Sequence, residues 1–362
     1  MGACRAVIGA GSLLTAAMLG GCTSMEALPH SRLGAIPFPG PFTLYVSSGV
    51  DDLGEHYYSS WSARPFSVQE GARGIMYTCR AGFVDLAHVR LTADWTRYIW
   101  EQTHTLAAAG GGSHTFDFEN ARYTLEITLP SWWSGLTETE RKAMLRDASL
   151  ITGQRVACEI MAWHEIATWY GWTTVPLVSE EGSAFTWDDA ASHVVGSIVG
   201  ARVLATGDAE YDRRTGEAMR VLLEELGAVS TDKVDDAAEA LNGLWWKDGV
   251  AIRRDLETGL NGEAKYPWLV PNFEPCVGCT PAILRIPTLA RVRGRNLDGF
   301  YRLQIEPSSS VQRRIEAATG LKGEIEPARD YPVILGAIRK EMAQRWGDGF
   351  DQPGAGQKLS AK

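Results

Sequence analysis

A long helical pattern in the middle of the chain limits the architectures open to it. Thr137-Glu-Thr-Glu140 matches a capping box, in which a Thr and a Glu side chain bond the free backbone amides at the start of a helix. The helical pattern continues from there to Gly171, and Thr152-Gly153 predicts a bend or break within it. We therefore expect an architecture rich in helices.

Apolar residues follow helical spacing in two further segments. One runs from Gly82 to about Leu106, and the other begins at Thr186 and continues through SHVVGSIVGARVL. Gly196 and Gly200 share one face of this last helix, which predicts the close approach of another helix. Further helices are expected at 217–226, 234–244, 311–318 and 331–346.

Short strands complete the expected fold. The run SHTFDFENARYTLEITLP alternates apolar and polar residues, which is typical of a strand or hairpin. Two more strands are expected around 283–292 and 300–305. We predict a single helix-rich α+β domain with short antiparallel strands over residues 42–350, followed by a disordered tail over 351–362.

The first 22 residues have the pattern of a lipoprotein signal. A basic residue, Arg5, precedes an apolar run from Ala6 to Met18, and Leu19-Gly20-Gly21 stands directly before Cys22. The run is shorter than the roughly 20 residues that span a bilayer. We expect residues 1–22 to be a signal peptide with a lipobox and Cys22 to carry the lipid; an ordinary signal peptide or a buried helix is the alternative.

The residues after Cys22 bear on the location of the protein. The residue after Cys22 is Thr23 and not an aspartate. In this the chain resembles Gram-negative lipoproteins that have a residue other than aspartate at this position and are sorted to the outer membrane. The resemblance implies a lipid-anchored protein that faces the periplasm and contacts the membrane through its anchor. Residues 23–41 are rich in Pro and Gly, which predicts a tether.

Composition narrows the class of partner. A formal charge of −9 with 22% charged residues argues against nucleic acid as the main partner. Thirteen tryptophans favour aromatic-lined surfaces. The partner in the envelope, whether glycan, lipid or protein, stays open.

The stretch WHEIATWYGW begins like the zinc-protease signature H-E-x-x-H. In that signature the histidines bind zinc and the glutamate activates water. His164 and Glu165 match its first half, but Thr168 stands where the second histidine would be. A metal site would therefore need ligands from elsewhere in the chain.

Two other helical segments pair a histidine with a carboxylate at spacings that share a helix face. Asp85 and His88 are three residues apart, and Asp189 and His193 are four apart. We expect zinc or another divalent metal on His88, Asp85 and His164, with Glu165 as the catalytic base. His193 and Asp189 form the second-choice ligand pair.

The same residues also have purely structural interpretations. Asp189 can complement the dipole of its helix. Asp85 and His88 can form a surface pair or a buried hydrogen-bonded pair. His164 and Glu165 can lie on a solvated helix face.

Four cysteines follow Cys22, namely Cys79, Cys158, Cys276 and Cys279, and they allow three disulfide pairings. TCRAGFVDLAH resembles the nucleophile segment of the NlpC/P60 cell-wall cysteine peptidases, which makes Cys79 a candidate thiol site. An extra residue before the glycine departs from that pattern. A structural thiol, a disulfide between Cys79 and Cys158, and a small disulfide within Cys276-Val-Gly-Cys279 are the alternatives.

Three segments, YTCRAGFVDLAHVR, WHEIATWYGW and SAFTWDDAASHVVG, together resemble a family of bacterial lipoproteins defined as a domain of unknown function. The likeness covers about Phe42 to Trp346. It implies an envelope protein and assigns no catalytic residue.

Three functions are consistent with these patterns. The first is a metal-dependent hydrolase acting on a component of the cell envelope. The second is a non-catalytic envelope binding or scaffold protein that uses an aromatic surface around Trp132, Trp133, Trp169 and Trp172. The third is a cysteine peptidase that uses Cys79.

Overall fold

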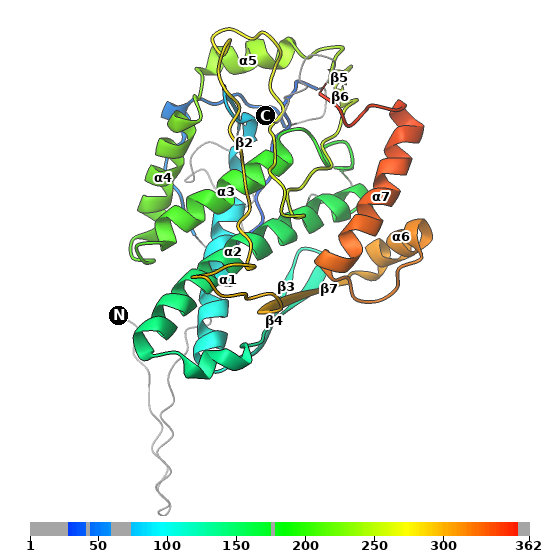
Figure 1. Cartoon of the computed structure of the whole chain (residues 1–362). Coiled ribbons are helices and arrows are strands. Elements are labelled where there is room, and N and C mark those ends of the chain that lie inside the picture. The colour runs from blue at the N-terminus through cyan, green and yellow to red at the C-terminus, as the bar shows by residue number, and fades with distance from the viewer. Residues whose placement is uncertain (1–27, 41–43, 59–73, 175–177, 354–362) are drawn as a thin grey trace, which may run out of the picture.

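The computed structural model of the chain describes residues 28–40, 44–58, 74–174 and 178–353, and it confirms a single helix-rich α+β domain (Figure 1). The helices are α1 (Leu86–Ala108), α2 (Glu138–Trp169), α3 (Asp189–Leu204), α4 (Tyr211–Glu225), α5 (Thr231–Glu239), α6 (Ser309–Thr319) and α7 (Pro327–Trp346), with short 3-10 helices at Val50–Asp52 and Ser131–Gly135. The strands are β1 (Ile75–Thr78), β2 (Gly82–Asp85), β3 (Gly112–Phe118), β4 (Ala121–Ile127), β5 (Trp246–Lys247), β6 (Val250–Ala251) and β7 (Tyr301–Pro307). None of the helices in these ranges is long and apolar enough to cross a bilayer.

Helix α2 begins as predicted. The Thr137 hydroxyl accepts a hydrogen bond from the Glu140 amide, and the Glu140 carboxylate accepts one from the Thr137 amide at 2.9 Å. The helix then runs unbroken through residues 152 and 153, so of the predicted bend or break the break is wrong. Gly153 instead allows α1 to come close, because a Cβ there would lie 2.6 Å from the carbonyl oxygen of Thr96.

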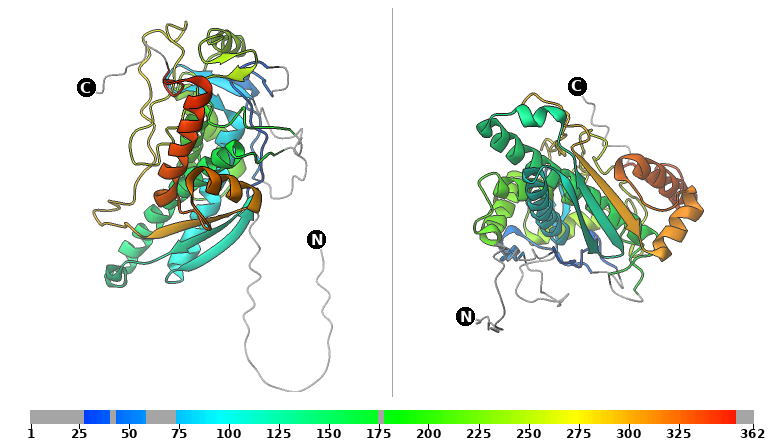
Figure 2. Two further views of the ribbon diagram at one scale, coloured as in Figure 1. Left: turned by 90° about the vertical axis from the view of Figure 1, so that its right-hand side faces the viewer. Right: turned by 90° about the horizontal axis from the view of Figure 1, so that it is seen from below.

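Helices α1, α2 and α3 pack against one another at the centre of the molecule (Figures 1 and 2). The expected close approach on the Gly196 and Gly200 face is confirmed, and the neighbour is α1. A Cβ at Gly196 would lie 2.4 Å from the carbonyl oxygen of Val89, and one at Gly200 would lie 2.8 Å from the Cβ of Thr96. The two glycines thus set how closely α1 and α3 can pack.

A three-stranded antiparallel sheet, in the order β3-β4-β7, packs on this helical centre. The predicted hairpin forms β3 and β4, and the predicted strand near residue 300 forms β7. Phe116 and Tyr123 are partners across the hairpin and stack with ring centroids 5.1 Å apart, while Trp95 of α1 packs against Phe116. The sheet therefore shares one hydrophobic core with α1 and α2.

Two predicted elements differ in the structure. Residues 82–85 form strand β2, paired with β1, and α1 begins only after Asp85. The strand expected at 283–292 does not form, since only single bridges occur there, Lys265 with Leu284 and Val292 with Arg295. This segment buries Leu284, Ile286, Leu289 and Val292 but has no continuous partner strand.

The N-terminal segment contributes to the core. Residues 28–40, predicted to belong to a tether, instead pack on the domain, and Ile36 and Phe38 are buried. Arg32 forms a fully buried ion pair with Asp94 of α1, with Nη1 and Oδ2 2.9 Å apart. The predicted signal peptide, Cys22 and residues 23–27 lie outside the described residues.

Part of the predicted tail also packs on the domain. The carbonyl oxygen of Pro353 accepts a hydrogen bond from the indole of Trp245 at 3.0 Å. The prediction of a disordered tail from residue 351 is thus wrong for residues 351–353. Residues 354–362 lie outside the described part of the chain.

A disulfide joins Cys79, directly after β1, to Cys276, 197 residues later. Cys158 is a buried free cysteine and Cys279 an exposed one. The expected pairings of Cys79 with Cys158 and of Cys276 with Cys279 are therefore both wrong. The actual bond links a loop near residue 276 to the β1–β2 turn.

Candidate metal centre

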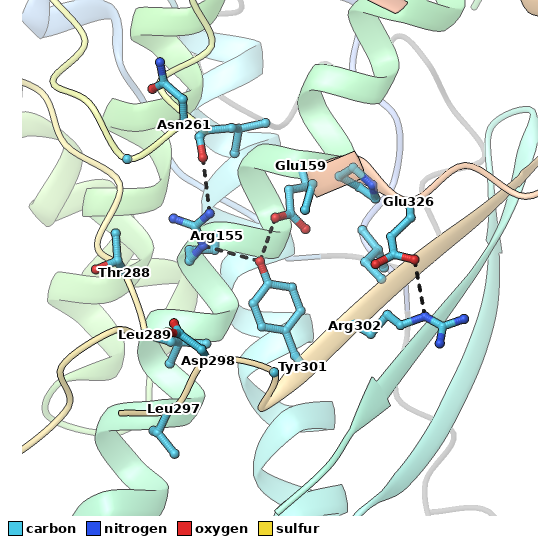
Figure 3. Close-up of a pocket in the computed structure, with 16 residues that line it drawn as sticks. Arg155, Glu159, Asn261, Thr288, Leu289, Leu297, Asp298, Tyr301, Arg302 and Glu326 are labelled. Atoms are coloured by element: carbon cyan, nitrogen blue, oxygen red, sulfur yellow. Dashed lines mark hydrogen bonds and ion pairs between the residues drawn. The ribbon is translucent and has the colours of Figure 1, made fainter. Parts of the chain in front are cut away.

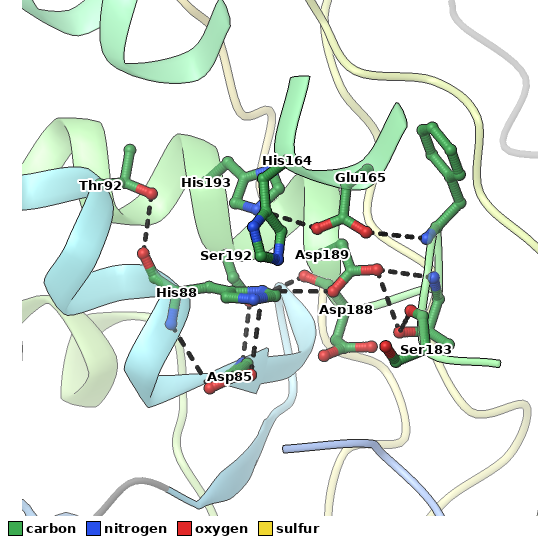
Figure 4. A network of polar contacts seen from close by, with 12 residues as sticks. Asp85, His88, Thr92, His164, Glu165, Ser183, Asp188, Asp189, Ser192 and His193 are labelled. Carbon is green, nitrogen blue, oxygen red and sulfur yellow. Dashed lines mark hydrogen bonds and ion pairs between the residues drawn. The ribbon is translucent and has the colours of Figure 1, made fainter. Parts of the chain in front are cut away.

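Five ionisable side chains from three helices meet in the interior of the protein (Figure 4). His88 lies in the first turn of α1, and His164 and Glu165 lie near the end of α2. Asp189 and His193 lie in the first two turns of α3. The packing of α1, α2 and α3 thus brings together three segments that are far apart in the sequence.

His88, His164 and Glu165 form the tightest group. Each offers one ligand atom, and these atoms all lie within 4.8 Å of one another. The ring of His193 lies 5.2 Å from that of His88, and its Nε2 is 3.7 Å from Oε1 of Glu165. Oδ1 of Asp189 is 3.2 Å from Nδ1 of His88. The second-choice pair therefore belongs to the same cluster as the first.

Several polar atoms of this cluster are buried without a hydrogen bond. Nδ1 of His88, Oε1 of Glu165 and Nε2 of His193 have no hydrogen-bond partner among the described residues. The contact between His88 and Asp189 is short but lacks hydrogen-bond geometry. Leaving a buried polar atom unpaired costs about 1–3 kcal/mol. The cluster thus has unused capacity to bind a ligand.

His164 is oriented by a residue that the sequence patterns did not reveal. Its Nδ1 lies 3.0 Å from Oε2 of Glu119, which occupies the turn between β3 and β4. A proton on Nδ1 donates to this carboxylate, so Nε2 is the nitrogen that would bind a metal after losing its own proton. Histidine ligands in metal sites are commonly held in this way by a carboxylate.

The loop before α3 orients the two carboxylates of the cluster. Oε2 of Glu165 accepts a hydrogen bond from the Phe185 amide at 3.0 Å. Oδ2 of Asp189 accepts one from the Thr186 amide at 2.7 Å and another from the Thr186 hydroxyl at 3.1 Å. Each carboxylate therefore has one oxygen fixed by this loop and a second oxygen on the histidine side.

Asp85 has a different role from the predicted one. Its Oδ1 accepts hydrogen bonds from the Ala87 and His88 amides, which makes it the N-cap of α1. Its Oδ2 accepts the Ala35 amide at 2.7 Å and lies 3.8 Å from Nδ1 of His88. Asp85 is not among the ligand atoms that converge within 4.8 Å of one another, and its bonds to backbone amides hold it at the start of α1, where it positions His88.

Burial and neighbouring charges shift the pKa values of four side chains in the cluster. Burial disfavours a charged imidazole, but Asp85, Asp189 and Glu165 surround His88 and hold its pKa well above the usual value. Burial also lowers the pKa of His164, but the negative charge and the hydrogen bond of Glu119 outweigh burial and raise this pKa to about 9. Burial and the repulsion of Asp189 raise the pKa of Glu165 to about 8. Burial and the neighbouring His88 and His164 place the pKa of His193 well below its usual value, so that His193 is neutral.

The two rival sites do not assemble as expected. Cys79 is bonded to Cys276, so it offers no thiol as a nucleophile. Trp133 and Trp169 are buried core residues, and Trp132 and Trp172 pack partly buried against the same core. These four tryptophans therefore do not form an exposed aromatic surface.

Comparison with known proteins gives one match. No curated protein and no solved structure is significantly similar to the chain. The family model described as "Protein of unknown function (DUF4056)" matches residues 13–254, which include the whole cluster. The chain belongs to this family of proteins of unknown function.

Proposed function

We propose that His88, His164 and Glu165 bind a divalent metal ion such as zinc, and that the protein is a metal-dependent hydrolase. The observation that carries this proposal is the convergence of three ligand atoms within 4.8 Å in a buried site. Unpaired atoms on His88 and Glu165 support it, because a metal ion held by these residues would satisfy them.

The set of donors suits hydrolytic chemistry. Two imidazoles and one carboxylate are the protein ligands of several catalytic zinc sites, in which a fourth position stays open for water. A metal ion at such a site lowers the pKa of water toward neutrality. In this proposal Glu165 is a ligand rather than the base. Asp189 lies beside His88, is fixed by Thr186, and can accept the proton of the water.

We further propose that the substrate is a component of the cell envelope. The lipobox at Cys22 supports this, because a diacylated N-terminus would hold the domain at the outer membrane, facing the periplasm. The net charge of −9 is consistent with a substrate other than nucleic acid.

Metal content tests the site directly. The chain from Thr23 onward, purified without chelators or a His tag, should contain near-stoichiometric zinc, manganese or iron by mass spectrometry. His164→Ala should lose the metal, whereas His104→Ala, on the exposed face of α1, should keep it. Absence of metal from the wild type, even after incubation with added ions, would contradict the proposal.

Glu165→Gln separates the two roles of this residue. Loss of metal identifies Glu165 as a ligand, whereas retention of metal with loss of hydrolysis identifies it as the base. Hydrolysis is assayed on isolated envelope glycan, peptide and lipid fractions. It should stop on addition of a chelator and return with added metal.

A further inference from the structure

A groove separate from the metal centre lies between α7 and the loop over residues 256–265, and Figure 3 shows the residues that line its smaller lobe. It has two adjoining lobes, of about 260 and 480 Å³. Arg155 and Glu159 of α2 and Tyr301 of β7 line both lobes and come together at the centre of the groove. A groove of this size is in the range of small-molecule sites.

These three side chains are held in place by one another. The Tyr301 hydroxyl donates a hydrogen bond to Oε1 of Glu159 at 2.6 Å, and Nε of Arg155 donates to the Tyr301 oxygen at 3.3 Å. The Arg155 guanidinium also donates to the carbonyl oxygens of Pro287 and Leu260, each at 3.3 Å. The groove therefore has a rigid polar centre that presents both donors and acceptors.

Burying the carboxyl group of Glu159 in this position costs free energy. Its side chain is almost fully buried, and burial raises its pKa to about 7 against the opposing effects of Tyr301 and Arg155. A perturbed carboxyl group in a groove marks a candidate functional site. This carboxyl group takes no part in the metal centre.

The lining of the groove indicates the chemistry of its ligand. Its cationic side chains are Arg155, Lys265, Arg302 and Arg339, and its acidic side chains are Glu159, Glu257, Glu263, Asp298 and Glu326. Three of the cations are already paired, Lys265 with Asp255, Arg302 with Glu326, and Arg339 with Asp351. Because acidic side chains outnumber the cations and most of the cations are already paired, the groove suits a neutral ligand better than a phosphorylated one.

The walls combine polar and apolar groups. Asn261 and Thr288 add an amide and a hydroxyl to the lining, while Leu260, Leu289 and Pro327 supply apolar surface. A saccharide has the matching chemistry, since its hydroxyls both donate and accept hydrogen bonds and its C–H faces pack on apolar and aromatic side chains.

We propose that this groove is a second ligand site, which binds a neutral oligosaccharide through Arg155, Glu159 and Tyr301. The site is independent of the metal centre. Glu159 and Glu165 are six residues apart on α2, about 9 Å along the helix axis and about 120° apart around it. A chain without metal should therefore still bind the saccharide.

Binding of two neutral trisaccharides, chitotriose and maltotriose, tests the proposal by calorimetry and saturation-transfer NMR on the chain from Thr23 onward. At least one should bind saturably at millimolar concentration or below. Tyr301→Phe should weaken this binding at least about tenfold, or about 1.4 kcal/mol. Tyr266→Phe, at an exposed tyrosine outside the groove, should not change it.

A second variant leaves the polar centre intact. Ala328 is exposed and lines both lobes, so Ala328→Trp should fill the groove and abolish binding without removing any hydrogen bond. Circular dichroism and thermal melts confirm that each variant is folded. The proposal is overturned if neither trisaccharide binds, if Ala328→Trp binds as well as the wild type, or if inorganic phosphate competes for the site.

Discussion

Nδ1 of His164 lies 3.0 Å from Oε2 of Glu119, although 45 residues separate the two in the sequence. Glu119 stands in a tight turn between β3 and β4, with a positive φ of 52°. The three-stranded sheet therefore supplies a residue that orients a ligand on α2. The proposed metal centre depends on the sheet as well as on the three helices.

Glu119→Ala should weaken metal binding by about 10- to 100-fold, because His164 loses the carboxylate that fixes its orientation and tautomer. Competition with a chromophoric chelator measures the affinity. Glu126→Ala is the matched control, since Glu126 lies on β4, exposed to solvent, and pairs only weakly with Arg302. Equal affinities for the two variants would show that Glu119 does not support the ligand.

Gly196→Ala should destabilise the protein by about 1–3 kcal/mol, because the added Cβ would meet the Val89 backbone and α3 would have to move away from α1. Gly216→Ala in α4 is the control. There the nearest atom is 3.9 Å from the added Cβ, so the higher helix propensity of alanine should stabilise by up to about 1 kcal/mol. Urea unfolding measures both effects, and a neutral Gly196→Ala would show that the helices can separate at little cost.

The buried carboxyl group of Glu159 should make stability fall as the pH rises. Its pKa is about 7 in the folded protein, whereas an unfolded glutamate has a pKa of about 4.3. Between these values the unfolded chain releases a proton that the folded chain keeps. The stabilising contribution is thus complete below about pH 4 and is lost as the pH rises through about 7.

Glu159→Gln cannot ionise and should lack this dependence. From pH 4 to pH 7 the free energy of unfolding of the wild type should fall by about 3 kcal/mol relative to that of the variant. Urea titrations at several pH values measure the difference, with the exposed Glu316→Gln as control. Parallel profiles for wild type and Glu159→Gln would contradict the buried, protonated state.

Alkylation should distinguish the cysteines of the chain from Thr23 onward. Under native conditions Cys279 should react alone, because Cys158 is buried and its pKa is raised to about 12. Denaturation should expose Cys158, and only reduction should release Cys79 and Cys276. Peptide mass mapping checks the order, and native labelling of Cys79 would show that the disulfide is absent.

Cys22→Ala should abolish labelling by a radioactive fatty acid in cells that express the full chain. The physical reason is that the thiol of Cys22 is the expected site of acylation. The measurement is the radioactive label on the protein in the membrane fraction. Cys279→Ala is the control and should keep the label. Continued labelling of Cys22→Ala would place the lipid elsewhere or exclude it.

Local patterns predict most of the helices, because their signals lie within a few residues of the element. The capping box at Thr137 and the glycine face of α3 are examples. Gly153 misleads for a tertiary reason, since it serves close packing on α1 and not a break in α2. The segment 283–292 misleads because buried apolar residues do not guarantee a partner strand.

The candidate site is predictable in its residues but not in its assembly. Each histidine beside a carboxylate is visible in the sequence, yet only the packing of α1, α2 and α3 shows that His88, His164 and His193 meet. Glu119 has no helical spacing to mark it. Asp85 falls inside the helix expected from Gly82, and its role as an N-cap shows only because residues 82–85 form β2 and α1 begins at Leu86.

The packing of residues 28–40 on the domain limits how far the protein can reach. Six residue steps separate Cys22 from Leu28, where partly buried contact with the core begins. Even fully extended they span only about 20 Å. If Cys22 carries the lipid, Leu28 stays within about one membrane half-thickness of the bilayer surface, so the domain begins close to the membrane and cannot move freely through the periplasm.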